Sequence, residues 1–189
     1  MAGRARRILV IGADGFVGRR LVPHLEERFG AGAAMPAGRD PGLGGVALDL
    51  RDEGSVRAAL GRAEPTHVVN LAGVAASAEA RLAWETHLFG VDRLGRAMLE
   101  LCPEAWLLSV GSGRAYGRSA RGGRPVTERD PLEPTETSGL VRVAGDLAGG
   151  ALAEEGLKAI RLRPFGHSGA GQSERFAIPA LAGRKARTR

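Results

Sequence analysis

The sequence predicts an α/β fold in which a doubly wound parallel sheet of about six strands carries helices on both faces. Short apolar runs alternate with amphipathic stretches along the chain, as in successive strand–helix units. The first run, Ile8–Ile11, is continuously apolar, which suits a strand buried on both faces. Three glycines, Gly12, Gly15 and Gly18, separate this run from an amphipathic stretch over residues 19–29, which we expect to be a helix.

The other elements follow the same alternation. We expect five further strands, over residues 33–37, 46–50, 66–71, 106–110 and 157–162. We expect three further helices, over residues 55–60, 81–101 and 141–154. Residues 111–134 are rich in Gly, Pro and Arg and predict a long loop, which at this length is typical of a functional or mobile segment. We expect one domain over residues 1–183, followed by a basic tail over residues 184–189.

The glycine turn after the first strand predicts a dinucleotide site. Such a turn aims backbone N–H groups and the positive end of a helix at one point, which suits a pyrophosphate. Gly12 would allow the turn, Gly15 the approach of the pyrophosphate, and Gly18 the close packing of helix on strand. Phe16 and Val17 lie between these glycines and belong to the same predicted site. The turn therefore predicts a Rossmann-type fold that binds NAD or NADP.

The choice between the two cofactors depends on the end of the second strand. Arg39 lies 21 residues after Gly18, where folds of this type contact the adenosine ribose. An acidic residue there accepts a hydrogen bond from the 2′-hydroxyl group, whereas an arginine can pair with a 2′-phosphate. Arg39 therefore favours NADP, while the neighbouring Asp40 leaves NAD open.

Composition and charge narrow the class of function. The chain has 189 residues, enough for one sizeable α/β domain. Its formal net charge is +6, but seven of its 27 basic residues lie at the two ends: Arg4, Arg6, Arg7, Arg184, Lys185, Arg187 and Arg189. The remaining 20 balance the 21 acidic residues, and only 4% of residues are aromatic. We therefore expect a small-molecule substrate and no nucleic-acid partner.

The chain carries a single cysteine, Cys102. One cysteine excludes an internal disulfide and predicts a reducing compartment, for which the cytoplasm is the default. No apolar run is long enough to cross a membrane, no signal peptide is visible, and no Cys/His cluster has metal-ligand spacing. We therefore expect neither a membrane partner nor a metal ion.

Several short motifs occur together and in a recognisable order. They are GADGFVG at 12–18, DLRD at 49–52, NLAG at 70–73, GSGRAYG at 111–117 and RPFGH at 163–167. With these motifs the chain resembles an extended short-chain dehydrogenase/reductase of the nucleotide-sugar epimerase/dehydratase kind. The sequence GAGQ at 169–172 is similar to reductases of GDP-4-keto-6-deoxymannose and to GDP-mannose 4,6-dehydratases. The resemblance covers nearly the whole chain.

The resemblance implies roles for particular positions. Asp49 and Leu50 would border the adenine, and the segment after the fourth strand would pass beneath the cofactor: Leu71, Ala72 and Gly73. Ser112 falls where the family has the Ser or Thr that hydrogen-bonds the carbonyl or hydroxyl group of the substrate. The resemblance also implies a homodimer through the helices at 81–101 and 141–154, and a longer chain whose substrate lobe is largely absent here.

The catalytic pair of the family is missing. The family uses a Tyr and a Lys four residues apart, and alignment places Ser138 and Arg142 at these positions. The loss does not depend on the alignment, because the chain has one tyrosine, Tyr116, and only two lysines, Lys158 and Lys185. A serine hydroxyl is a much weaker acid than a phenol, and arginine does not give up its proton. Losing a positioned acid or base typically costs about 10²–10⁴-fold in rate.

Two histidines are candidates to replace the lost acid. His87 stands in the long helix where the resemblance places an asparagine, and His167 follows the last predicted strand. Histidine titrates near neutral pH, so either ring could transfer a proton. Three hypotheses remain open: a nucleotide-sugar oxidoreductase with a degenerate catalytic site, a non-redox cyclase, isomerase or dehydratase that reuses the cleft, and a non-catalytic cofactor-binding regulator or partner subunit.

Overall fold

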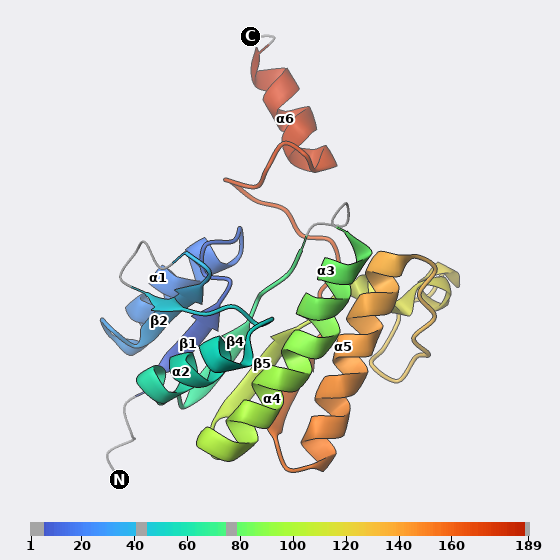
Figure 1. Ribbon diagram of the computed structural model, residues 1–189. Helices are drawn as coiled ribbons and strands as arrows, with labels where there is room; N and C mark the ends of the chain where they lie inside the picture. Colours follow the sequence, from blue (N-terminus) through green and yellow to red (C-terminus); the bar gives the residue numbers. More distant parts are fainter. Residues whose placement is uncertain (1–5, 41–44, 75–78, 188–189) are drawn as a thin grey trace.

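The computed structural model describes residues 6–40, 45–74 and 79–187, and the side chains up to residue 182. Its centre is a six-stranded parallel sheet with strand order β3-β2-β1-β4-β5-β6 (Figure 1). The order reverses between β1 and β4, and in doubly wound sheets such a reversal opens a crevice at the carboxyl ends of the strands. The predicted Rossmann-type sheet of six strands is confirmed.

The strands are β1 (Ile8–Ile11), β2 (Ala34–Gly38), β3 (Val46–Ala47), β4 (His67–Asn70), β5 (Trp106–Val110) and β6 (Lys158–Leu162). All pairings are parallel, and Ile11 is level with Asn70, which is level with Ser109. The carboxyl ends of β1, β4 and β5 therefore meet at one edge, where the loops that follow them build the cleft.

β3 is shorter than the expected strand over 46–50. The strand ends at Ala47 because polar groups of the following residues form hydrogen bonds at the start of the next helix. The backbone N–H of Asp49 donates to the hydroxyl of Ser55 at 3.0 Å, and the Asp52 side chain caps α2 (Glu53–Ala63) by accepting from the N–H of Ser55. Leu48 still donates its backbone N–H to the carbonyl of Gly38 at 2.8 Å, and the turn takes residues 49–52 out of the ladder.

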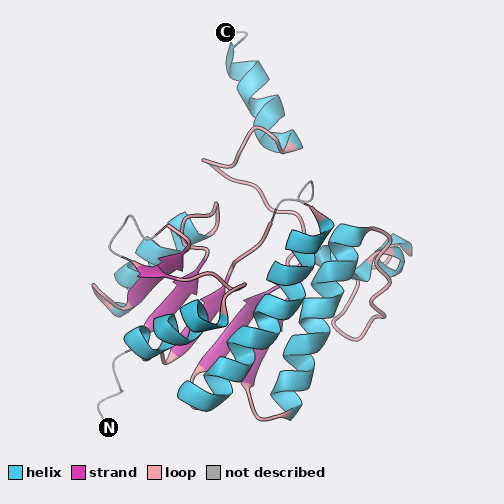
Figure 2. Ribbon diagram, in the orientation of Figure 1, coloured by secondary structure: helices cyan, strands magenta, loops and turns pink. Residues whose placement is uncertain are grey.

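The remaining helices lie on the two faces of the sheet, except for the last helix of the chain, which stands apart from it (Figures 1 and 2). They are α1 (Gly18–Phe29), α3 (Ala80–Trp84), α4 (Gly90–Leu101), α5 (Thr137–Glu154) and α6 (Ala177–Arg187), with a π-helical turn η1 (Glu85–Phe89) and two 3₁₀ turns, η2 (Gly113–Tyr116) and η3 (Arg118–Arg121). The helix predicted over 81–101 is therefore α3, η1 and α4 in succession. No helix in the described ranges is both long and apolar enough to cross a lipid bilayer.

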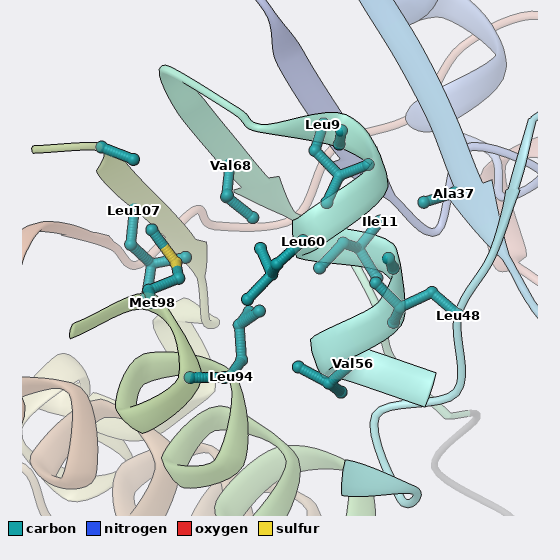
Figure 3. Packing of buried hydrophobic residues seen from close by; sticks show 14 of the residues in the cluster. Leu9, Ile11, Ala37, Leu48, Val56, Leu60, Val68, Leu94, Met98 and Leu107 are labelled. Atoms are coloured by element: carbon teal, nitrogen blue, oxygen red, sulfur yellow. The ribbon is translucent and has the colours of Figure 1, made fainter. Parts of the chain in front are cut away.

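The core lies mainly on one face, where α2, α4 and α5 pack on the sheet (Figure 3). Leu60 and Leu94 meet Leu9, Val68 and Leu107 there, and each of these side chains is essentially inaccessible. The opposite face carries a smaller cluster in which α1 covers the other side chains of β1 and β4. β1 is thus buried on both faces, as its continuous apolar run predicted.

α5 begins four residues before the expected start and packs unusually close to the π-helical turn. A Cβ atom added at Gly145 would lie 2.0 Å from the carbonyl oxygen of His87. The glycine therefore permits the contact that brings α5 against the back of the cleft. α6 was not predicted; it stands apart from the sheet in Figure 1, and residues of the expected basic tail belong to it.

Candidate functional site

The glycine turn has the geometry that a phosphate cradle requires. Gly12 has a φ of +80°, and its N–H donates to the carbonyl of Ala37 at 2.9 Å. A Cβ atom at Gly18 would lie 2.4 Å from the carbonyl oxygen of Gly12, so only glycine lets α1 start this close to β1. The first turn of α1 holds no acidic residue and no side-chain cap, and Arg19 and Leu21 donate their N–H groups to the carbonyls of Gly15 and Val17.

Two adjoining cavities lie at this edge of the sheet. The larger, of about 820 Å³, is lined by the glycine turn, the ends of β4, β5 and β6, and α5. The smaller, of about 210 Å³, lies toward β2 and β3 and shares Gly12, Gly15 and Gly73 with the larger. Every predicted cofactor residue lines one or both: Gly12, Gly15, Phe16, Val17, Gly18, Arg39, Asp49, Leu50, Leu71, Ala72 and Gly73.

The smaller cavity is the adenosine end of the predicted site. Arg51 donates to the carboxylate of Asp49, and this hydrogen bond lowers the pKa of Asp49 against the opposing effect of burial. Within the described part of the chain, Arg39 forms no hydrogen bond or ion pair. The carboxylate of Asp49 is therefore hydrogen-bonded to Arg51, and the charge of Arg39 also attracts it, although more weakly.

Ser112 lines the larger cavity directly after β5. Its Oγ accepts from the backbone N–H of Arg114 at 3.2 Å, which caps the 3₁₀ turn η2. The hydroxyl hydrogen is not used in this bond, so the same group can donate to a ligand in the cavity. Ser112 thus serves the turn and also fits its predicted contact with substrate.

Ser138 and Arg142, one helical turn apart on α5, differ in placement. Arg142 lines the larger cavity, half-buried above Gly73, where an added Cβ would lie 3.2 Å from its Nη2. Burial, followed by repulsion from Arg114, lowers the pKa of Arg142. Ser138 is not among the cavity-lining residues, and its hydroxyl donates to Oε2 of Glu136 at 3.3 Å. Only Arg142 reaches the cavity directly.

His87 lies in the π-helical turn and is almost completely buried. Burial, with repulsion from Arg142, lowers the pKa of His87 to about 4, so the ring is neutral at pH 7. Its Nε2 accepts from the backbone N–H of Val74 at 3.5 Å. The geometry therefore favours a role in holding the segment after β4 over a role as proton donor.

His167 is exposed and lies against the glycine turn. Its ring stacks on Phe16, with centroids 6.2 Å apart, and its Nδ1 lies 3.1 Å from the carbonyl oxygen of Phe165. Arg20 of α1 donates to the carbonyl of Ala170 at 2.6 Å. The segment after β6 therefore crosses over the start of α1, and His167 borders the cavity from that side.

The comparison with known sequences decides the family. The profile of the NAD dependent epimerase/dehydratase family matches residues 8–187. The chain belongs to this family. The sequence-based resemblance to nucleotide-sugar enzymes is confirmed.

Two relatives of this epimerase/dehydratase chain are reductases. It is 36% identical over 146 residues to a dTDP-4-dehydrorhamnose reductase of Streptomyces griseus, covering 75% of this chain and 44% of the relative. It is 29% identical over 189 residues to a GDP-6-deoxy-D-mannose reductase of Pseudomonas aeruginosa, covering 96% of this chain and 59% of the relative. The chain thus spans about half the length of these relatives.

Solved structures share the fold. A candidate epimerase from Burkholderia cenocepacia superposes with a TM-score of 0.84 at 27% identity, covering 97% of this chain and 62% of that protein. A dTDP-glucose 4,6-dehydratase from Bacillus anthracis, solved with NAD, superposes with a TM-score of 0.85 at 19% identity, covering 98% and 63%. At that identity the second match supports the fold alone.

The wall of the larger cavity opposite the glycine turn does not include the tyrosine of this epimerase/dehydratase chain. Its single tyrosine, Tyr116, is buried, accepts from Nη1 of Arg163 at 3.3 Å, and is not among the cavity-lining residues. The wall instead carries Glu136 and Arg114, joined by an ion pair of 2.9 Å. Sequence reasoning missed both, because Glu136 precedes a helix whose start was expected at residue 141.

Proposed function

We propose that this chain binds NAD(P) and acts, with a degenerate catalytic site, on a nucleotide sugar or a related keto or hydroxy compound. The observation that supports this most strongly is the glycine turn, where an added Cβ at Gly18 would strike the backbone of Gly12. Such a close approach has a clear use when a pyrophosphate sits on the N-terminus of α1. The family match and the reductase relatives point to the same substrate class.

The proposal is supported by the predicted residues, which line two adjoining cavities across which a dinucleotide could extend. The glycine turn would hold the pyrophosphate, and Asp49 and Leu50 would border the adenine. Ala72 and Gly73 would lie beneath the nicotinamide half, with Arg142 above Gly73. When bound, NAD(P) supplies or accepts a hydride. We propose NADP as the preferred form, because Arg39 lines the smaller cavity, makes no hydrogen bond or ion pair with the described residues, and can pair with a 2′-phosphate.

The proton-transfer half of the reaction is weakened. Ser112 can donate a hydrogen bond to a substrate oxygen, but Ser138 is a poor acid and Arg142 keeps its proton. Arg142 can still offset negative charge that develops on a substrate oxygen, because its half-buried guanidinium borders the cavity. We therefore expect ordinary ketone reduction to be very slow.

A second candidate is a non-redox or non-catalytic use of the same cleft. It is favoured by the neutral state of His87 and by the absence of Ser138 from the residues that line the cavity, since neither offers a tuned acid there. Under this hypothesis the cofactor, if bound, has a structural or regulatory role. The chain then works as a cyclase, isomerase or dehydratase, or as a non-catalytic regulator or partner subunit.

Calorimetric titration with NADP⁺ and NAD⁺ tests the proposal. We expect binding of both, tighter for NADP⁺. Gly15→Val should abolish binding, because its side chain would fill the phosphate cradle, while the circular dichroism spectrum stays unchanged. Arg39→Ala should weaken NADP⁺ by about tenfold and leave NAD⁺ unchanged, since a charged hydrogen bond would be lost. The proposal fails if neither cofactor binds the wild-type chain.

Restoring the family pair separates the two candidates. In protein that binds cofactor, Ser138→Tyr combined with Arg142→Lys should raise reductase turnover by about 10²-fold or more if the site is a degenerate reductase. The single variants serve as matched controls. No gain in the double variant, despite bound cofactor, would favour the non-redox or non-catalytic use. His167→Gln and His87→Gln, measured separately, test the substitute-acid hypothesis, which ends if turnover is unchanged in both.

We also propose that the chain forms a homodimer through α4 and α5. Leu140 and Leu147, two turns apart on α5, are 47% and 59% exposed, and Phe89 at the junction with α4 is 47% exposed. These side chains leave an apolar strip on the helices that lie side by side in Figure 1. Burying this strip against a second copy would be favourable.

A further inference from the structure

The wall of the larger cavity between η2 and α5 is positively charged. Arg114 and Arg142 both line it, from elements adjacent in space, and the acidic residue among the lining residues is Glu136. Burial, followed by repulsion from Arg114, lowers the pKa of Arg142. Two cations held this way, in a partly desolvated cavity, create a potential that favours an anion.

Arg142 is the uncommitted member of the pair. Among the residues that the structure describes, its guanidinium makes no hydrogen bond and no ion pair. The guanidinium is nevertheless half-buried and lies over Gly73. A Cβ atom added at Gly73 would lie only 3.2 Å from Nη2 of Arg142. Withdrawing a charge from water without a partner is costly, so this placement is best explained by a ligand that pairs with the group.

Glu136 shows which chemistry suits the wall. Its carboxylate lies 2.9 Å from Nη1 of Arg114 and also accepts from the hydroxyl of Ser138. Both partners of this ion pair are largely exposed, at 64% and 66%, so the pair is weak and exchangeable. The chain thus already places one carboxylate on Arg114 and none on Arg142.

We propose that the substrate carries an anionic group, a carboxylate or a phosphate, that binds between Arg142 and Arg114 beside Ser112 and releases Arg114 from Glu136. The planar guanidinium of arginine can donate two parallel hydrogen bonds to two oxygens of either group. A substrate hydroxyl would not need this geometry, because a lysine could bind it equally well. That the anion belongs to a substrate rests on the proposed function. The anion site itself can be tested without that function.

The experiment titrates malonate, and separately methyl phosphate, onto protein saturated with NADP⁺, so that the glycine turn is occupied. Calorimetry should detect one site for at least one of the two probes, and their relative affinity decides between carboxylate and phosphate. Arg142→Met should weaken binding about tenfold or more, and Arg142→Lys should weaken it less. Glu136→Gln should tighten it several-fold, because a competing carboxylate is removed.

The matched control is Arg118→Met, on an exposed arginine of η3 that is not among the cavity-lining residues. This variant should bind malonate and methyl phosphate with the same affinity as wild type. If NADP⁺ binds but neither probe does, or if Arg142→Met binds the probes like wild type, the anion site is wrong and the proposed function stands. If NADP⁺ does not bind, the same titrations on the free protein, with Gly15→Val as a second background, still decide the anion site.

Discussion

At the scale of single residues, His87 is distinguished by a neutral ring in an almost fully buried position. Its pKa is about 4 in the folded chain, against 6.5 for an unperturbed histidine, because of burial and then Arg142. Between these pH values the unfolded chain binds more protons than the folded chain. The free energy of unfolding should therefore fall as the pH drops from about 6.5 toward 4.

We expect this group to contribute a loss of about 2–3 kcal/mol between pH 7 and pH 4. Urea unfolding across that range measures it. His87→Gln should flatten the pH dependence, whereas His24→Gln, on the exposed side of α1, should leave it as in wild type. His67, whose pKa is also lowered by burial, remains in both variants. Equal slopes in the two variants would contradict the neutral, buried state of His87.

At the scale of elements, the contact between α5 and the π-helical turn depends on one glycine. In an ordinary helix interior Gly→Ala stabilises by about 1 kcal/mol. At Gly145 the new Cβ would lie 2.0 Å from the carbonyl oxygen of His87, which is backbone and cannot move aside alone. Gly145→Ala should therefore lower the free energy of unfolding, by about 2–4 kcal/mol.

Gly61 on α2 is the matched control for this substitution. Nothing lies within 4 Å of its ideal Cβ position, so Gly61→Ala should stabilise the chain. Denaturant midpoints of the two variants and wild type give the comparison. A neutral or stabilising effect at Gly145 would mean that α5 and the π-helical turn separate easily.

The elements also show where sequence reasoning succeeds. β5 was predicted at its observed bounds, and β1 likewise, because a run of four or five apolar residues between turn signals admits few alternatives. The third strand was predicted too long. Leu48 and Leu50 are buried as expected of strand residues, but they reach the core from the turn that Asp52 caps. Alternating buried side chains in the sequence therefore have the same appearance there whether the backbone forms a strand or a turn.

The candidate site was predictable in one half only. The cofactor side follows from local motifs, since the glycine turn and the strand ends fix Gly12, Asp49 and Gly73 by chain position. The facing wall comes from residues 111–142, whose conformation depends on tertiary contacts such as the bond from Arg163 to Tyr116. For this reason the pairing of Arg114 with Glu136 had no sequence signal. The π-helical turn, which lies inside an ordinary helical pattern, had none either.

At the scale of the whole molecule, the proposed homodimer can be tested by its apolar strip. Leu147→Glu would place a charge within the strip, where burial without a partner is costly. We expect wild type to sediment as a dimer and Leu147→Glu as a monomer. Leu181→Glu, at an equally exposed leucine of α6, should remain dimeric. If the dimer dissociates in Leu181→Glu but not in Leu147→Glu, the interface lies at α6 instead.

The π-helical turn also preserves the rotational phase of the helix that contains it. A π turn holds one residue more than an α turn, so deleting one residue from 85–89 would restore regular α-helix and leave α3 and α4 close to their present relative orientation. Leu82 lines the smaller cavity from α3, on the far side of the turn from α4. It would keep its place at the cavity while α4 kept its packing. A one-residue deletion within the turn should therefore disturb the cavity less than a one-residue deletion within α4, which would rotate the preceding helix by about 100°.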